Sequence, residues 1–123
     1  SYTKTDDHVH IAHNCVIGEA CMFTASASIG GSVKAGKNCW FGLNCTVMNG
    51  LTLGSYIMIG THTNVIKNVQ DFELLAGSPA RRLGWVSKAR EKLDLPPEGS
   101  GEAVCPKKGT RYVLEKNILR EDS

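Results

Sequence analysis

The chain lacks the features that would place it in a membrane or on nucleic acid. Its 123 residues carry a formal net charge of only +2, which is too weak to indicate a nucleic acid or a membrane surface as a partner. No apolar run approaches the roughly 20 residues needed to span a bilayer, and no signal-peptide pattern opens the sequence. The composition therefore predicts one ordinary domain in the cytoplasm, with no nucleic-acid or membrane partner.

The cysteines also lack the spacing of a metal site or a disulfide framework. They number five, an odd count, and no two of them form a Cys-x-x-Cys pair. Cys15, Cys21, Cys39 and Cys45 lie inside apolar segments. Neither a zinc site nor a secreted disulfide scaffold is therefore supported. We expect small, buried, reduced thiols and no bound metal.

What the sequence does contain is a repeat of six residues that begins at Ile11. Cut there, it reads IAHNCV, IGEACM, FTASAS, IGGSVK, AGKNCW, FGLNCT, VMNGLT, LGSYIM, IGTHTN, VIKNVQ. The first position of each hexad is apolar, the fifth is small or aliphatic, and six of the ten second positions are glycine. The fifth position explains the four cysteines, because it selects compact side chains that point inward.

A period of six fits neither the 3.6 residues of a helical turn nor the spacing of a hairpin meander. It is typical of a β-solenoid, in which each short strand stacks on its counterpart one coil away. We expect the glycines at second positions to form tight corners, because glycine tolerates positive φ. Residues 11–70 resemble the hexapeptide-repeat, left-handed parallel β-helix, in which three hexads make one triangular coil of 18 residues. The handedness comes from this resemblance alone.

The repeat and the segments after it predict three parts. Residues 5–75 form the β-helix, residues 76–95 a closing loop and a short helix, and residues 96–123 a small β extension. In the helix, Ser87 is expected to cap the N-terminus, and Val86, Ala89 and Leu93 to form one apolar side. The extension reads as two or three strands joined by Pro-Lys-Lys-Gly and Glu-Lys-Asn turns.

The phrase GSPARRLGW follows the repeat and contains Gly77, Pro79, Ala80, Arg81 and Arg82. It resembles the segment that closes the solenoid in many acyl-coenzyme A dependent hexapeptide acyltransferases. That resemblance implies that Gly77, Ala80, Arg81 and Arg82 help to hold the coenzyme A nucleotide, whose phosphates favour cationic, fork-shaped donors. The alternative is a loop with solvated arginines. LGWVS and the later CP-x-x-G-x-RY-x-L phrase resemble C-terminal extensions of some sugar acetyltransferases.

Three histidines lie within residues 8–13, and the 18-residue coil assigns each to a different column. His13 shares an outward column with Gly31, Asn49 and Lys67, so it is not expected in the core. Some hexapeptide proteins resembling carbonic anhydrases bind zinc through three histidines. Their pattern requires histidines one coil later, which His10 and His13 lack, so a metal is not expected.

IAHN followed by xxIG resembles a phrase of the acyltransferases that acylate the amine of UDP-3-O-acylglucosamine. The resemblance implies that His13 is the general base, because a neutral imidazole can accept the proton of an attacking amine. Asp6 or Asp7 could orient its ring. Leu51 departs from the family, which has a second histidine just after the Asn-Gly pair.

The resemblance also implies a homotrimer that binds acetyl-coenzyme A, or another acyl-coenzyme A, in the groove between solenoids. Gly31 would leave room for the thioester, Asn49 would contact the sugar or thioester, and Lys67 would join the residues that bind the donor. The leading hypothesis is an N-acyltransferase of an amino sugar carried on a nucleotide. The alternatives are an O-acetyltransferase of a sugar or small hydroxyl compound, and a non-catalytic trimeric module or truncated relative.

Overall fold

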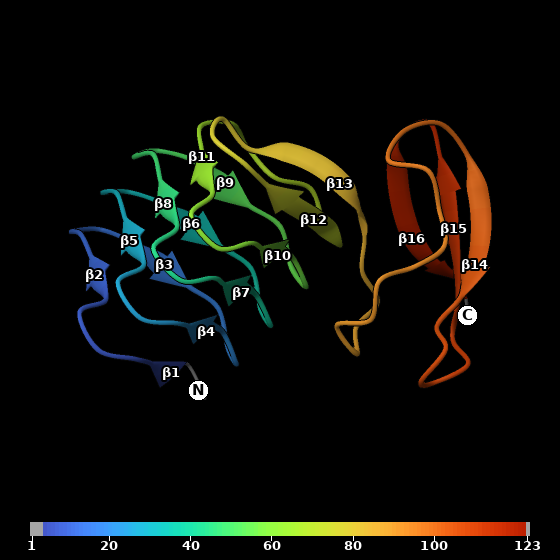
Figure 1. Cartoon of the computed structure of the whole chain (residues 1–123), viewed down its shortest axis with the longest axis horizontal. Helices are drawn as coiled ribbons and strands as arrows, with labels where there is room; N and C mark the ends of the chain where they lie inside the picture. Colours follow the sequence, from blue (N-terminus) through green and yellow to red (C-terminus); the bar gives the residue numbers. More distant parts are fainter. Residues whose placement is uncertain (1–3, 123) are drawn as a thin grey trace.

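The chain is all-β, and its N-terminal part winds into a parallel β-helix (Figure 1). The computed structural model describes residues 4–122, which form strands joined by turns and loops and contain no helix. The strands are β1 Lys4–Thr5, β2 His10–Ile11, β3 Val16–Ile17, β4 Met22–Phe23, β5 Ser28–Ile29, β6 Lys34–Ala35, β7 Trp40–Phe41, β8 Thr46–Val47, β9 Thr52–Leu53, β10 Met58–Ile59, β11 Asn64–Val65, β12 Glu73–Ala76, β13 Arg81–Trp85, β14 Gly101–Val104, β15 Arg111–Glu115 and β16 Ile118–Asp122. Within the described residues there is no helix long and apolar enough to cross a membrane.

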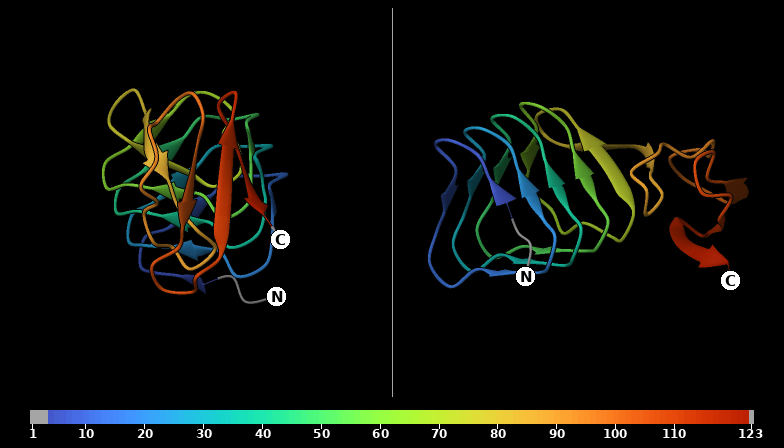
Figure 2. Two further views of the ribbon diagram at one scale, coloured as in Figure 1. Left: turned by 90° about the vertical axis from the view of Figure 1, so that its right-hand side faces the viewer. Right: turned by 90° about the horizontal axis from the view of Figure 1, so that it is seen from below.

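The short strands stack into three faces of a prism (Figure 2). One face has the order β1-β4-β7-β10-β12-β13, the second β11-β8-β5-β2 and the third β3-β6-β9. His10 lies opposite Ser28 and Val16 opposite Lys34, in parallel register. Each of these steps along a sheet is therefore eighteen residues, which confirms the predicted coil. The fold class, a parallel β-helix of hexapeptide repeats, is confirmed.

The interior of the prism is built from the first and fifth positions of the hexads, as predicted. Ile29, Phe41 and Leu53 are buried, whereas Ile11 and Ile17 are partly buried and pack against the same cluster. The fifth positions contribute Cys21, Ala27, Val33, Cys39, Cys45, Leu51, Ile57 and Thr63. Stacking of identical positions brings like side chains together across coils, and the rings of Phe23 and Phe41 lie parallel with centroids 4.3 Å apart. Such offset or stacked pairs add to the burial of apolar area.

The backbone turns at the fourth position of each of the first nine hexads, so the expectation of positive φ at second-position glycines is wrong. The non-glycine residues with positive φ in the coils are His8, Asn14, Ala20, Ser26, Ser32, Asn38, Asn44, Tyr56, His62 and Phe72. Gly30, at a second position, does not have positive φ. A Cβ atom there would lie 2.6 Å from the backbone nitrogen of Asn49 in the next coil. Close approach of neighbouring coils, rather than φ, excludes a side chain at Gly30.

The fourth coil, residues 59–74, is two residues shorter than the others, so the tenth hexad is not a regular one. Val65 still pairs with Val47, eighteen residues earlier, but Val69 pairs with Leu53, only sixteen residues earlier. Val69 therefore occupies a first position and not the predicted fifth. The pairing of β12 with β10 keeps this shorter step.

A side chain replaces the backbone group that the shortened corner lacks. In the regular coil, the Lys34 N–H donates to the carbonyl oxygen of Leu51 at 3.0 Å. One coil later, the Thr52 N–H donates to Asn68 Oδ1 at 2.8 Å. The amide of Asn68 thus satisfies a donor that the missing fifth-position carbonyl would otherwise have served.

A hairpin closes the end of the stack. Strands β12 and β13 pair antiparallel, and the turn between them covers β11. The Asn64 N–H donates to the carbonyl of Gly77 at 2.9 Å, and the Ala80 N–H donates to the carbonyl of Asn64 at 2.9 Å. The GSPA turn therefore satisfies backbone groups that the last coil would leave unpaired.

The helix predicted within residues 76–95 is wrong. Val86 forms an antiparallel bridge with Lys92, and Arg90 has positive φ. Ser87 Oγ accepts the N–H groups of Ala89 and Glu91, as a helix cap would, but the chain then reverses. A helix of about ten residues is marginal in water, and hydrogen bonds to the neighbouring sheet stabilise the loop instead.

The C-terminal extension is a three-stranded antiparallel sheet in the order β14-β15-β16, as expected. It has its own core, formed by Phe72, Trp85, Leu93, Cys105, Tyr112, Leu114 and Leu119. The ring of Phe72 packs edge-on against Tyr112, with centroids 5.5 Å apart. Since Phe72 lies at the end of the fourth coil, this contact joins the sheet to the prism.

Candidate functional site

Four of the predicted site residues lie along one corner of the prism. His13, Gly31 and Asn49 occupy equivalent positions in consecutive coils, and Lys67 lies in the shortened corner that follows. The Ser32 N–H donates to the His13 carbonyl at 2.9 Å, which fixes this stacking. Parallel strands lie about 4.8 Å apart, so the His13 and Asn49 backbones are about 10 Å apart and those of His13 and Lys67 roughly 14 Å. His13 and Asn49 therefore do not touch within one chain.

The His13 side chain is exposed, and within residues 4–122 its ring has no hydrogen bond or ion pair. Asp6 and Asp7, expected as possible orienting groups, make no hydrogen bond or ion pair with this ring; the Asp7 N–H donates to Asp6 Oδ1. Among the described residues, no three His, Cys, Asp or Glu side chains are grouped so that they could hold a metal ion. The corner thus presents an accessible imidazole that lacks an orienting partner among the residues that the structure describes.

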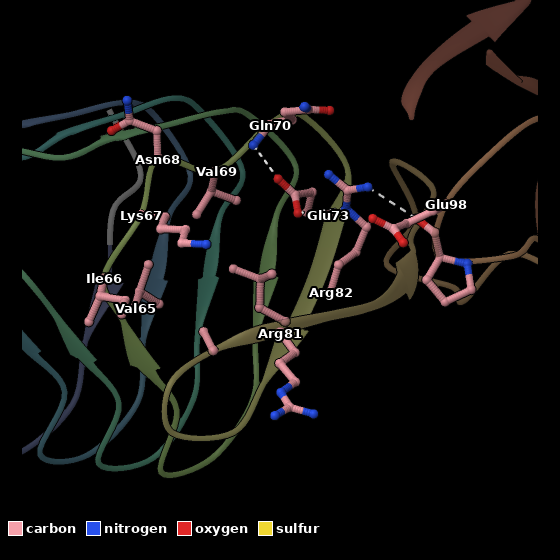
Figure 3. A pocket seen from close by; sticks show the side chains of 13 residues that line it. Val65, Ile66, Lys67, Asn68, Val69, Gln70, Glu73, Arg81, Arg82 and Glu98 are labelled. Carbon is pink, nitrogen blue, oxygen red and sulfur yellow. Dashed lines mark hydrogen bonds and ion pairs between the residues drawn. The ribbon is translucent and has the colours of Figure 1, made fainter. Parts of the chain in front are cut away.

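A pocket of about 440 Å³ lies at the far end of this corner (Figure 3). It brings together Lys67, Ala80, Arg81 and Arg82 of the predicted donor-binding set, whereas Gly77 does not line it. The shortened corner, the closing hairpin and the linker before β14 supply its walls. The remaining lining residues are Val65, Ile66, Asn68, Val69, Gln70, Glu73, Leu75, Pro97 and Glu98.

The three cations of the pocket differ in their surroundings. The Arg82 Nε lies 2.8 Å from Glu73 Oε2, and its Nη1 donates to the Pro97 carbonyl at 3.1 Å. Lys67 and Arg81 are exposed and have no ion pair among the described residues. In Figure 3, Lys67 extends toward the middle of the lining residues and Arg81 extends away from Glu73. Lys67 and Arg81 are therefore the cations that remain available to an anionic ligand.

Sequence reasoning missed Glu73 and Glu98, the two carboxylates that line the pocket. Glu73 is buried although it is charged, and it begins the otherwise apolar strand β12. A lone charge in a strand that is otherwise apolar indicates a buried ion pair, so this signal could have marked Glu73 as a paired residue without identifying its partner. Glu98, in a Pro-rich linker, gives no such signal.

Two of the buried cysteines, Cys39 and Cys45, are not candidates for a nucleophile. All five are free thiols; Cys15 is half-buried and the others are buried. A hydrogen bond with the Cys21 thiol, together with burial, raises the pKa of Cys39. Burial raises the pKa of Cys45 to about 12. The thiols of Cys39 and Cys45 therefore remain protonated near neutral pH, and the thiolate is the reactive form.

No family model matches the chain. Among curated proteins, it is 38% identical over 93 residues to a UDP-3-O-acylglucosamine N-acyltransferase of Caulobacter sp. (strain K31), covering 70% of this chain and 27% of that protein. It is 33% identical over 116 residues to the acyl-[acyl-carrier-protein]–UDP-N-acetylglucosamine O-acyltransferase of Thiobacillus denitrificans, covering 93% of this chain and 43% of that protein. The chain thus spans less than half the length of these relatives.

Among solved structures, the chain is similar to a mutant of perosamine N-acetyltransferase from Caulobacter crescentus in complex with CoA and GDP-perosamine. The TM-score is 0.61 at 25% identity, covering 64% of this chain and 38% of that one. The predicted resemblance to hexapeptide-repeat sugar acyltransferases is thereby confirmed.

Proposed function

We propose that this chain forms the donor-binding solenoid of an acyl-coenzyme A dependent N-acyltransferase, with acetyl-coenzyme A as the expected donor. Its acceptor is the amine of an amino sugar carried on a nucleotide. The observation that carries the proposal is the corner on which His13, Gly31 and Asn49 lead to the basic pocket beside Lys67 and Arg81. Such an arrangement suits an elongated donor with a thioester at one end and phosphates at the other.

In this reaction the amine attacks the thioester carbonyl carbon, the C–N bond forms and the C–S bond breaks. His13 accepts the amine proton, which an imidazole can do near neutral pH. The coenzyme A thiolate leaves and takes up a proton. Gly31 presents no side chain between His13 and Asn49, and its N–H has no partner among the described residues. That N–H is a donor for the developing oxyanion.

The proposal includes a homotrimer, with the donor between neighbouring solenoids. Met48 and Ile66 support it, because both are large apolar side chains that remain exposed beside the His13 corner. Measuring the mass in solution, with and without acetyl-coenzyme A, tests the assembly: a monomer under both conditions contradicts it. The five free thiols suit a reducing compartment, so the cytoplasm is the proposed location.

The decisive experiment measures release of free coenzyme A from acetyl-coenzyme A with an amino-sugar nucleotide such as GDP-perosamine. The His13→Ala variant should lose turnover by about 10²–10⁴-fold, the usual contribution of a general base. His10→Ala is the matched control, because His10 is also exposed but lies on a strand face rather than on this corner. Near-normal turnover in His13→Ala would remove His13 from the mechanism.

A second candidate is O-acyl transfer to a sugar hydroxyl. The observation that favours it is the match to the Thiobacillus O-acyltransferase, which covers 93% of this chain. A panel of matched amine and hydroxyl acceptors distinguishes the two reactions. A non-catalytic module, by contrast, would release no coenzyme A with either acceptor and would bind none in a calorimeter.

A further inference from the structure

One wall of the pocket is the linker before β14, which contributes Pro97 and Glu98. Arg82 connects this linker to the prism by a hydrogen bond to the Pro97 carbonyl. We infer that Arg82 is a positioning residue for the donor site and not itself a ligand of the donor phosphates. We name Glu73, Arg82 and Trp85, together with the carbonyls of Pro96 and Pro97, the Arg82 clamp. The inference rests on the proposed function, because it assumes that an anionic donor occupies this pocket.

The charge of Arg82 is already compensated. Its Nε lies 2.8 Å from Glu73 Oε2, with side-chain exposures of 18% and 7% for the two residues. The other oxygen of Glu73 accepts the N–H of Gln70, so the carboxylate is held by the shortened coil. A phosphate would have to displace a buried, hydrogen-bonded carboxylate, which is unfavourable because it leaves that charge unpaired.

The remaining contacts of Arg82 are to the linker and its support. Nη1 donates to the Pro97 carbonyl at 3.1 Å, and the guanidinium lies over the Trp85 ring, 4.5 Å from its centroid. Trp85 Nε1 in turn donates to the Pro96 carbonyl at 3.1 Å. A planar guanidinium makes these contacts simultaneously, whereas an ammonium group cannot. The clamp therefore fixes Pro97 and Glu98 as one wall of the pocket.

The two pocket carboxylates provide a test in which the same chemical change has opposite effects. Glu73→Gln weakens the clamp, so the wall loosens and the donor KM should rise about fivefold to tenfold, the effect of one hydrogen bond of ordinary strength. If Arg82 were instead a phosphate ligand, Glu73→Gln would release it and lower the KM. Glu98→Gln is the matched control: it removes a negative charge from the pocket without touching the clamp, so the KM should fall by about twofold.

Two further measurements separate positioning from a general loss of structure. In Glu73→Gln, kcat should change by less than about twofold, because the clamp lies roughly three coils from His13. The Gly99 amide donates to Asn117 Oδ1, and its hydrogen exchange should accelerate when the linker loosens. Trp85→Phe keeps the ring under Arg82 but removes the bond to Pro96, so it should show the same changes more weakly. Trp85→Phe replaces Glu73→Gln as the test variant if Glu73→Gln does not fold.

The outcomes distinguish this inference from the proposed function. If the unmodified protein transfers no acyl group, the proposed function fails, and the clamp is then tested by coenzyme A affinity in a calorimeter and by Gly99 exchange. Weaker affinity with faster exchange in Glu73→Gln supports the clamp. Tighter donor binding in Glu73→Gln, or unchanged exchange in both clamp variants, overturns it.

Discussion

Gly30 and Gly31 are adjacent, yet the structure predicts opposite consequences for the same substitution. A Cβ at Gly30 would lie 2.6 Å from the Asn49 nitrogen and 2.8 Å from its Cα. A Cβ at Gly31 would meet only the His13 carbonyl oxygen at 3.4 Å and the Ala12 Cβ at 4.0 Å. Neither glycine has positive φ, so backbone conformation does not distinguish them.

The change in the free energy of unfolding depends on which atoms must move to make room for the added methyl group. Inserting a methyl group into a packed interior costs about 1–3 kcal/mol, and at Gly30 the opposing atoms are backbone that cannot rotate away. Gly30→Ala should therefore reduce the free energy of unfolding by about 3 kcal/mol, the upper end of that range. Gly31→Ala should be neutral or stabilising by about 0.5 kcal/mol, because alanine restricts the unfolded chain.

Urea unfolding, followed by circular dichroism, measures both changes. The two variants differ from the natural sequence by the same methyl group, so each serves as the control for the other. We expect a much lower midpoint for Gly30→Ala at an unchanged slope, which indicates a change of stability rather than of compactness. Equal midpoints, or a larger loss in Gly31→Ala, would refute the account of coil spacing.

Two further predictions concern the core and the shortened corner. Burial raises the pKa of Cys45 from 9.0 to about 12, so its stabilising contribution is complete below pH 9 and is lost as the pH rises toward 12. Unfolding midpoints should fall over that range, and less so in Cys45→Ala. Asn68→Ala leaves the Thr52 N–H unpaired and should cost about 1–2 kcal/mol in urea unfolding. Lys67→Ala, whose side chain has no hydrogen bond within residues 4–122, should cost less than about 0.5 kcal/mol.

The parts of the fold that could be predicted are those that repeat. Because Ile29, Phe41 and Cys39 recur at fixed positions, their inward direction followed from the period alone. The turns with positive φ were assigned to the wrong position, although the fourth position, which is Asn or Ser in six of the ten hexads, contained the signal. The helix expected within residues 76–95 does not form, because contacts distant in sequence decide the conformation there, such as the bond from the Lys88 N–H to the Tyr112 hydroxyl.

The candidate site was predictable to a similar extent. The column of His13, Gly31, Asn49 and Lys67 followed from counting eighteen residues at a time. The state of Arg82 did not, because its pairing with Glu73 depends on an antiparallel hairpin whose register has an irregularity between Leu74 and Leu75. Side-chain partners across such a hairpin are set by packing and not by sequence distance.

The missing pair of residues in the fourth coil has a consequence for how the chain can vary in length. Every regular coil adds the same rise of about 4.8 Å, and only the shortened one is followed by the closing hairpin. An extra set of 18 residues inserted before Asn64 would leave the terminus of the stack unaltered and carry the imidazole one rise farther from it. The distance that a ligand must span between the imidazole and the closing hairpin therefore changes in steps of one coil, about 4.8 Å each.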